Sequence, residues 1–331
     1  MRALVTGATG FIGGHLAPKL LESGYKVRCL ARSASALERL NGLPVELCIG
    51  DLSDPVSLMK AVRGVDYIFH LAGLTKTGND NEFYDVNARG TKNLALAVLK
   101  ENPGLGKFIH LSSLAAAGPV LDGQPPLTED IEPHPVSHYG KSKLMGEEAV
   151  LDVIADRVPV VIMRPTAVYG PGDKDFYLFF KMISKGVFLY WGKCRYSLIY
   201  VEDLVRGIMA AARVPGERGR DKAKIYFLSD GNIYTNTEIA DAIAGAMPWT
   251  KRRKPVTIPV PRFILPMAAA FYEIGGCDSG IINRDKIREM RFKDWCCDAD
   301  RAGREIGFEP KITLKEGAKW TADWYKLQKW L

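Results

Sequence analysis

A phenol and an ammonium group four residues apart are the side chains best suited to acid–base chemistry in this sequence. Tyr139 and Lys143 have the spacing of neighbours on one face of a helix. A free phenol has a pKa near ~10, and an adjacent cation favours the phenolate, so the pair is predicted to move a proton. Two further pairs have this spacing, Tyr177/Lys181 and Tyr325/Lys329. These pairs lie outside the predicted sheet region, and we interpret them as ordinary helix pairs.

Two hydroxyl groups precede the pair at the end of a predicted strand. Ser112 and Ser113 follow the apolar segment 107–111, at the carboxyl edge where open α/β sheets bind ligands. Ser113 is therefore our candidate for holding a substrate oxygen while Tyr139 moves a proton. Ser112 is the alternative for that role. A simple cap at the strand end is the alternative for either serine.

The first fourteen residues have the pattern of a dinucleotide pyrophosphate site. A short apolar strand at 2–6 leads into Gly7, Gly10 and Gly13, and a helical pattern continues over 15–23. Glycine allows a tight turn and a close phosphate, and the start of a helix offers free N–H groups and a positive dipole end. The other loop residues assigned to the cofactor are Thr9, Phe11 and Ile12. The alternative is a plain tight turn between strand and helix.

The end of the second predicted strand indicates which dinucleotide binds. NAD-binding proteins usually place a carboxylate there for the ribose hydroxyls, but no carboxylate occurs between Glu22 and Glu38. Arg32 could instead bind a 2′-phosphate, so we expect a preference for NADP, with NAD as the second possibility. An exposed arginine that serves only solubility is the alternative. Asp51 and Leu52, after the third strand, are placed for the adenine edge or, equally, for a helix cap.

Strands and helices alternate over the first 165 residues. After the strand at 2–6, strands are predicted at 25–30, 45–49, 67–71, 107–111 and 158–163, and helices at 34–40, 55–62, 82–100 and 137–155. Near-continuous apolar strands between amphipathic helices favour an α/β fold, a Rossmann-type doubly wound parallel sheet. Residues 1–170 are the predicted cofactor domain, to which strands within 196–229 return. Residues 171–331 are the predicted smaller, mostly helical substrate region.

Composition narrows the class of protein. The chain has 331 residues, 47% hydrophobic content and a net charge of +7, ordinary values for an enzyme with a sizeable core. No basic tract with interleaved aromatics suggests nucleic acid, and the run 251–254 is interpreted as a solvated loop. The six cysteines have no metal-ligand spacing, so we expect no metal. The absence of an 18-residue apolar run or a signal peptide predicts a cytoplasmic protein without a transmembrane segment.

A series of short motifs connects these features. They are Gly7-x-x-Gly10-x-x-Gly13, Asp51-Leu52, Leu71-Ala72-Gly73, Asn87-x-x-Gly90, Ser112-Ser113, Tyr139-x-x-x-Lys143, Arg164-Pro165 and Tyr200-Val201-Glu202-Asp203. In this order they resemble the extended short-chain dehydrogenase/reductases, the NAD-dependent epimerase/dehydratase family, over nearly the whole chain.

The resemblance implies a role for each motif. Tyr139 would be the acid–base, Lys143 would bridge the nicotinamide ribose, and Ser113 would bind the substrate oxygen during hydride transfer. The cofactor-binding residues that the resemblance adds are Leu71, Ala72, Gly73, Asn87 and Pro165. It also implies a homodimer built through a four-helix bundle from the helices at 82–100 and 137–155.

The segment after Ser113 separates branches of that family. Nucleotide-sugar dehydratases carry an Asp-Glu pair there, whereas this chain has the apolar run 114–117, so we expect no dehydratase activity. An apolar wall favours a small-molecule substrate with an apolar flank. The segment resembles the one in 3β-hydroxysteroid dehydrogenases. An arginine after the second strand is a feature shared with dihydroflavonol reductases. We therefore expect reversible hydride transfer with a secondary alcohol or ketone.

Two other functions stay open at this point. Arg195 could hold the diphosphate of a nucleotide sugar, which would make the protein an epimerase, or it could form a structural salt bridge. A non-catalytic sensor or assembly factor on the same fold is the third possibility. The apolar stretch 259–272 could wall the substrate pocket or pack between domains.

Overall fold

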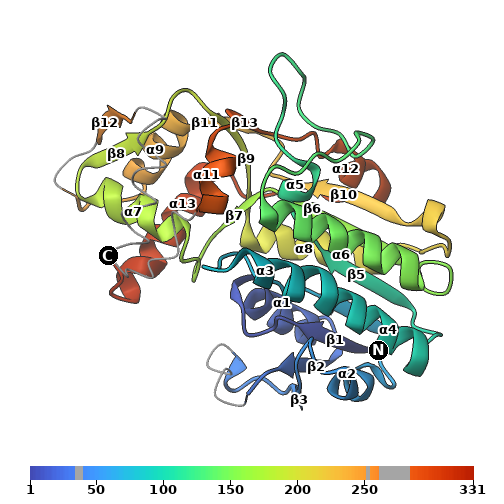
Figure 1. Cartoon of the computed structure of the whole chain (residues 1–331). Coiled ribbons are helices and arrows are strands. Elements are labelled where there is room, and N and C mark those ends of the chain that lie inside the picture. Colours follow the sequence, from blue (N-terminus) through green and yellow to red (C-terminus); the bar gives the residue numbers. More distant parts are fainter. Residues whose placement is uncertain (34–39, 251–253, 261–283) are drawn as a thin grey trace.

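The computed structural model describes residues 1–33, 40–250, 254–260 and 284–331 (Figure 1). Three predicted segments lie mostly outside these residues: the helix at 34–40, the basic run 251–254 and the apolar stretch 259–272. In the described part of the chain, no helix combines the length and the hydropathy that crossing a bilayer requires.

A seven-stranded sheet, parallel throughout, forms the larger layer and confirms the predicted fold class. Its strand order is β10-β6-β5-β4-β1-β2-β3. The strands are β1 (Arg2–Thr6), β2 (Lys26–Ala31), β3 (Glu46–Ile49), β4 (Tyr67–His70), β5 (Lys107–Leu111), β6 (Val160–Pro165) and β10 (Lys224–Leu228). Their carboxyl ends all meet one edge, which brings Gly7, Leu71 and Ser113 to the same side of the sheet.

Helices cover both faces of this sheet, which explains why its strands read as continuous apolar runs. One face packs on α1 (Phe11–Glu22), α8 (Val201–Arg213) and α12 (Asp300–Ile306). The other packs on α2 (Pro55–Val62), α4 (Thr91–Glu101) and α6 (His138–Ile154). Figure 1 shows α4 and α6 lying side by side across the front of the molecule.

The predicted helix at 82–100 is interrupted in the structure. It consists of α3 (Asp80–Phe83), a π-helical segment (Tyr84–Gly90) and α4. Asn87 lies in the π-helical segment, where its buried side chain bonds to the loop after β4. Hydrophobic periodicity does not register the extra residue that a π turn inserts.

The second region contains more strand than the mostly helical pattern predicts. Its four-stranded sheet comprises β7 (Ala167–Tyr169), β9 (Arg195–Tyr200), β11 (Ile233–Thr235) and β13 (Asp294–Trp295), and β8 (Val187–Tyr190) pairs with β12 (Val256–Pro259). The described helices here are α7 (Phe176–Ser184), α9 (Asn236–Gly245), α11 (Arg284–Met290) and α13 (Leu314–Leu327). β10 thus returns to the main sheet, whereas β9 belongs to the smaller one. Most of the missed strands have only two to four residues, too few to show a period.

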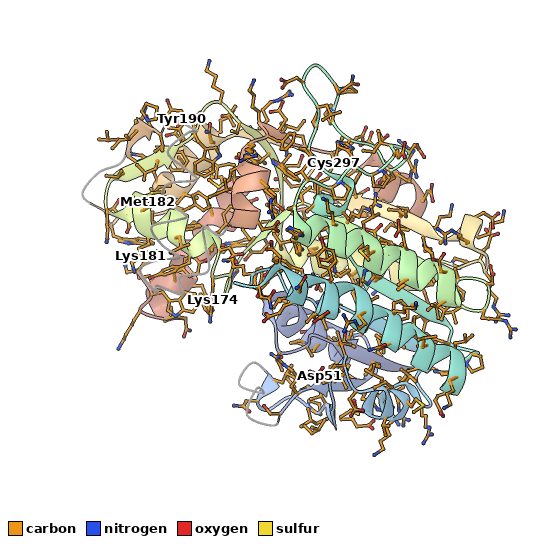
Figure 2. All side chains as sticks on the ribbon, viewed as in Figure 1. Asp51, Lys174, Lys181, Met182, Tyr190 and Cys297 are labelled. Carbon is orange, nitrogen blue, oxygen red and sulfur yellow. The ribbon has the colours of Figure 1, made fainter. Side chains whose placement is uncertain are left out.

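The two regions occupy opposite ends of the molecule. In Figure 2, Asp51 marks the far side of the main sheet, whereas Met182 and Tyr190 lie in the second region. The second region has its own core, which includes Phe180, Phe188 and Tyr325. Of the predicted site residues, Gly7, Leu71 and Ser113 follow strands of the main sheet at its carboxyl edge.

Candidate active site

The glycine-rich loop is packed too tightly for any larger residue at two positions. Gly7 has φ +74°, and a Cβ there would lie 2.7 Å from the nitrogen of Ala72. A Cβ on Gly13 would lie 2.1 Å from the carbonyl oxygen of Gly7. Gly10 begins α1 and, among the described residues, no side chain caps that helix end. Within the described part of the chain, the start of α1 therefore has N–H groups without a side-chain acceptor, which is the feature that anion-binding helix starts share.

The remaining residues of this loop are partly buried. Thr9, Phe11 and Ile12 are all of intermediate exposure, and Ile12 packs on the core under β1. The Phe11 ring meets the His15 ring edge to face at 5.7 Å. These contacts fix the first turn of α1 against the sheet.

The adenosine end predicted from sequence has a positive and a negative group close together. Arg32 is exposed directly after β2. The Asp51 carboxylate accepts hydrogen bonds from the amide and hydroxyl of Ser53, which hold the pKa of Asp51 below its usual value, and the charge of Arg32 acts in the same direction. Leu52 beside them is buried, and a Cβ on Gly90 would lie 2.9 Å from the Cβ of Leu52.

Asn87 ties the loop after β4 to α6. Its Oδ1 accepts from the Leu74 amide at 2.7 Å, and its Nδ2 donates to the Leu74 carbonyl at 2.9 Å and to Ser142 Oγ at 2.9 Å. A Cβ on Gly73 would lie 3.6 Å from Lys143 Nζ.

The start of this loop is held by β1. The amides of Leu71 and Ala72 donate to the carbonyl oxygen and the hydroxyl oxygen of Thr6, at 3.1 and 3.2 Å. Pro165, at the end of β6, is buried at the same edge.

Ser113, Tyr139 and Lys143 meet where α5 (Leu114–Ala117) and α6 begin. The Ser113 hydroxyl hydrogen-bonds to the Tyr139 phenol and also accepts the Ala115 amide at 3.1 Å. Lys143 Nζ donates to the Leu111 carbonyl at 2.7 Å. The fold thus brings Ser113 to Tyr139, and Lys143 follows Tyr139 by one helical turn on α6.

The charge balance at Tyr139 differs from the sequence expectation. Burial raises the pKa of the Tyr139 phenol to about 12, while the Ser113 hydrogen bond lowers it. Burial also lowers the pKa of Lys143 to about 8, and nearby Glu147 acts in the opposite direction. We expected Lys143 to bring the phenol toward neutral pH, but burial is the largest influence on the pKa of the phenol and acts in the opposite direction.

Ser112 lies in a different environment from Ser113. Its hydroxyl donates to Glu147, which also accepts Arg164 Nε at 2.9 Å and Nη2 at 2.6 Å. Both members of this ion pair are 2% exposed. Glu147 follows Lys143 by one helical turn, so this buried network fixes α6 against β5 and β6. The structure does not bring Ser112 to Tyr139.

Arg195 forms the salt bridge that was its alternative interpretation. Its exposed guanidinium donates to Asp294 at 2.7 Å across neighbouring strands β9 and β13.

Two buried histidines were missed by sequence reasoning. The rings of His70 and His110 stack at 5.2 Å on adjacent strands, and both are fully buried. His70 hydrogen-bonds to the hydroxyls of Thr6 and Thr91 at 2.7 and 2.8 Å. Burial lowers the pKa of His70 to about 3 and that of His110 well below its usual value, and Lys143 adds to both shifts. The available signal was a polar residue inside each of two apolar strands.

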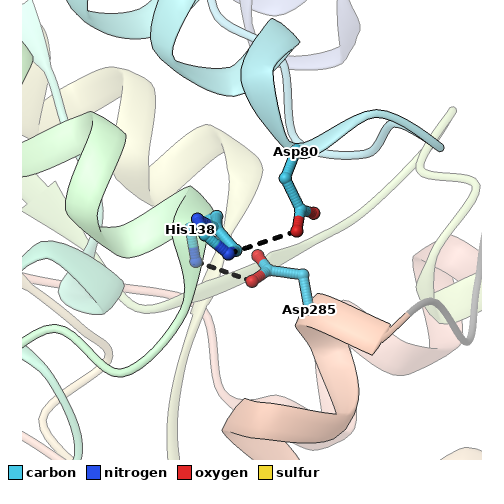
Figure 3. A group of neighbouring side chains, drawn as sticks. All are labelled: Asp80, His138 and Asp285. Atoms are coloured by element: carbon cyan, nitrogen blue, oxygen red, sulfur yellow. Dashed lines mark hydrogen bonds and ion pairs between the residues drawn. The ribbon is translucent and has the colours of Figure 1, made fainter.

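The second contact that sequence reasoning missed joins α11 to the start of α6. Asp80, His138 and Asp285 place one potential ligand atom each within 4.8 Å of one another (Figure 3). Arg288 already supplies a positive charge there, 3.0 Å from Asp285 and 3.7 Å from Asp80. We therefore interpret the group as an ion-paired contact between the two regions.

Comparison with known proteins gives consistent matches over the whole chain. The model of the NAD dependent epimerase/dehydratase family matches residues 3–225. A ceramide reductase of Caulobacter vibrioides is 31% identical over 99% of this chain and 95% of its own length. A UDP-glucose 4-epimerase of Vibrio cholerae is 29% identical, covering 96% and 94%. The structure of Thermus thermophilus UDP-glucose 4-epimerase with NAD has a TM-score of 0.77 at 23% identity, covering 98% and 99% of the chains, and shows the same fold.

Proposed function

Because the chain belongs to the NAD-dependent epimerase/dehydratase family, we propose that it transfers hydride reversibly between NADP(H) and a secondary alcohol or ketone on a partly apolar substrate. Family membership makes it an NAD-dependent oxidoreductase of the extended short-chain dehydrogenase type. The observation that carries the proposal is the hydrogen bond between Ser113 and Tyr139, one helical turn from Lys143.

Each of these residues has one task in the proposed reaction. The bound nicotinamide supplies or accepts the hydride. In the reducing direction Tyr139 gives its phenolic proton to the carbonyl oxygen as that oxygen becomes an alcohol, and in the oxidising direction the phenolate takes the proton back. The single O–H of Ser113, which donates to the Tyr139 phenol in the free site, would turn to the same oxygen once the substrate is bound. Lys143, held by Leu111, places a positive charge near the phenolate that remains.

The cofactor would lie along the carboxyl edge of the main sheet. The start of α1 with Gly7, Gly10 and Gly13 would bind the pyrophosphate, with Thr9, Phe11 and Ile12 in the same loop. Further along the edge, the nicotinamide half would contact Leu71, Ala72, Gly73, Asn87, Lys143 and Pro165.

An apolar substrate is favoured over a nucleotide sugar by two features of the site. Residues Leu114 to Ala117, which follow Ser113, contain no carboxylate and are buried. Arg195, the residue that would hold a diphosphate, is paired with Asp294. The similarity to a ceramide reductase supports this choice, whereas the similarity to a UDP-glucose 4-epimerase keeps nucleotide-sugar epimerisation as the second candidate.

A substrate screen separates the two candidates. The purified protein is incubated with NADPH and a panel of long-chain and cyclic ketones, beside UDP-sugars with NAD. We expect NADPH oxidation only with ketones, and Tyr139→Phe should abolish it. Turnover of UDP-sugars alone would contradict the apolar substrate. A sensor would keep its cofactor-dependent partner binding in the same variant, whereas an enzyme loses turnover.

The cofactor preference rests on Arg32. Its exposed guanidinium and the absence of a carboxylate at the end of β2 support binding of a 2′-phosphate. Arg32→Ala should raise the KM for NADPH by about tenfold, the order expected for one lost charged hydrogen bond, and leave the KM for NADH within about twofold. A lower KM for NADH than for NADPH in the unaltered protein would refute the preference.

We also propose a cytoplasmic homodimer joined through α4 and α6. Leu96 and Leu99 on α4 and Met145 on α6 are exposed apolar side chains on these neighbouring helices, which supports a helical interface. Light scattering during gel filtration gives the mass, and a monomer would contradict this part of the proposal.

A further inference from the structure

The first turn of α6 is held by a side chain from the other end of the sequence. The Asp285 carboxylate on α11 accepts the amide of His138 at 2.6 Å and the amide of Tyr139 at 2.9 Å. The first amides of a helix have no acceptor within the helix itself. The third, at Gly140, donates to Ser137 Oγ at 3.0 Å. Asp285 therefore satisfies the two amides that Ser137 leaves free, including that of Tyr139.

A second contact lies one turn further along α11. Glu289 accepts the hydroxyl of Ser137 at 2.8 Å and the ammonium of Lys286 at 2.7 Å. Asp285 and Glu289 are four residues apart and therefore share one face of α11. Both are buried, at 4% and 8% exposure, so neither contact is screened by solvent. α11 thus holds both the cap residue and the first two amides of α6.

The outer side of this contact neutralises its negative charge. His138 Nε2 lies 3.1 Å from Asp80, and His138 Nδ1 hydrogen-bonds to the Tyr84 hydroxyl at 2.7 Å. The Arg288 guanidinium faces both Asp80 and Asp285. Figure 3 shows Asp80 and Asp285 both reaching toward His138, Asp80 from above and Asp285 from below. The Arg288 guanidinium therefore offsets the charge of the buried Asp285 carboxylate.

We propose that α11 is the positioning element for Tyr139, with Asp285 holding the backbone that carries the phenol and Glu289 holding Ser137. The inference rests on the proposed role of Tyr139. Because Asp285 accepts the Tyr139 amide directly, loss of this contact frees the turn that aligns the phenol with Ser113. A displacement of about 1 Å at a reacting group can cost a hundredfold in rate.

The same face of α11 also sets the charge around the phenol. Glu289 raises the pKa of Tyr139 and Lys286 lowers it. Asp175 also raises the pKa, and Asp285 with its partner Arg288 lies at the amide side of the same turn. Removing the charge of Glu289 should therefore move the Tyr139 limb of the pH profile to lower pH in either reaction direction. A purely structural contact would leave that limb unchanged.

The first experiment compares Asp285→Ala and Asp285→Asn with Asp54→Ala. Asp54 is a matched control because its carboxylate caps α2 through the Val56 amide at 3.0 Å, away from Tyr139. Asp285→Ala should lower kcat by about ten- to hundredfold, keep the KM for NADPH within about twofold and speed amide exchange at 138–139. Asp285→Asn keeps one acceptor oxygen, so its kcat and its amide exchange should lie between those of the unaltered protein and those of Asp285→Ala. Asp54→Ala should lose stability without losing kcat.

The second experiment uses Glu289→Gln. Glutamine keeps an acceptor oxygen for Ser137, so this variant should fold even if Asp285→Ala does not. The pH profile of kcat should shift to lower pH. An unchanged profile for Glu289→Gln, or unchanged amide exchange and kcat for Asp285→Ala, would overturn the proposal. Amide exchange is measured without substrate, so it tests α11 even if Tyr139→Phe remains active and the proposed function fails.

Discussion

Replacing Ser113 with alanine is the most direct test of how the site handles the Tyr139 proton. Ser113 donates to the phenol and lowers its pKa, against a burial effect that raises it to about 12. A hydrogen bond to a charged group stabilises it by about 1.5–3 kcal/mol. Each 1.4 kcal/mol is about tenfold in rate. Ser113→Ala should therefore lower the rate of hydride transfer by about ten- to hundredfold and move the Tyr139 limb to higher pH.

Ser112→Ala is the matched control, because it removes the neighbouring hydroxyl from a different network. It removes one of the two donors to a buried Glu147 oxygen, which still accepts Arg164 Nε, and the lost hydrogen bond to a charged group should reduce the free energy of unfolding by about 1–3 kcal/mol. Its rate should stay within about twofold of the parent. The assay is single-turnover NADPH oxidation followed across pH, with urea unfolding of both variants. Equal rate losses in the two variants, or none in Ser113→Ala, would refute the assignment.

Two further predictions concern stability. Glu147→Ala leaves the buried Arg164 guanidinium without its carboxylate partner. It should reduce the free energy of unfolding by about 3–5 kcal/mol in urea titrations. A loss below about 1 kcal/mol would contradict this prediction. His70 and His110 have lowered pKa values in the folded protein. Below pH ~6.5 the unfolded chain therefore binds protons at these histidines that the folded protein does not bind. Stability should fall from about pH 6.5 toward pH 3, by up to about 1.4 kcal/mol per unit for each histidine. Unfolding at about pH 7, 6 and 5 checks this, and His110→Phe should show a shallower slope.

Local pattern was enough to locate most of the cofactor half of the molecule. The strand Arg2–Thr6, the glycine spacing and the helix Phe11–Glu22 are all encoded within the first 22 residues. Helix α2 has the bounds predicted for it, and Asp54 and Pro55 are residues typical of a helix start. Tyr139 and Lys143 share a helix face whatever the rest of the chain does.

The features that sequence reasoning missed depend on residues far apart in the chain. Ser112 and Ser113 are adjacent and chemically identical, and only the positions of Glu147 and Tyr139 separate their roles. The pKa of Tyr139 depends on burial, which no spacing reports. The contact of Asp285 with the Tyr139 amide spans 146 residues and has no local signature.

By itself, the sequence determined the parallel sheet, the glycine loop and the identity of the residues that could move a proton, because helix and strand periods and glycine geometry act over short distances. Only the tertiary structure decided which serine reaches Tyr139, that Arg195 is paired with Asp294, and that α11 holds the first turn of α6. These outcomes follow from packing between distant segments, where burial and charge are set by the neighbours that the fold brings together.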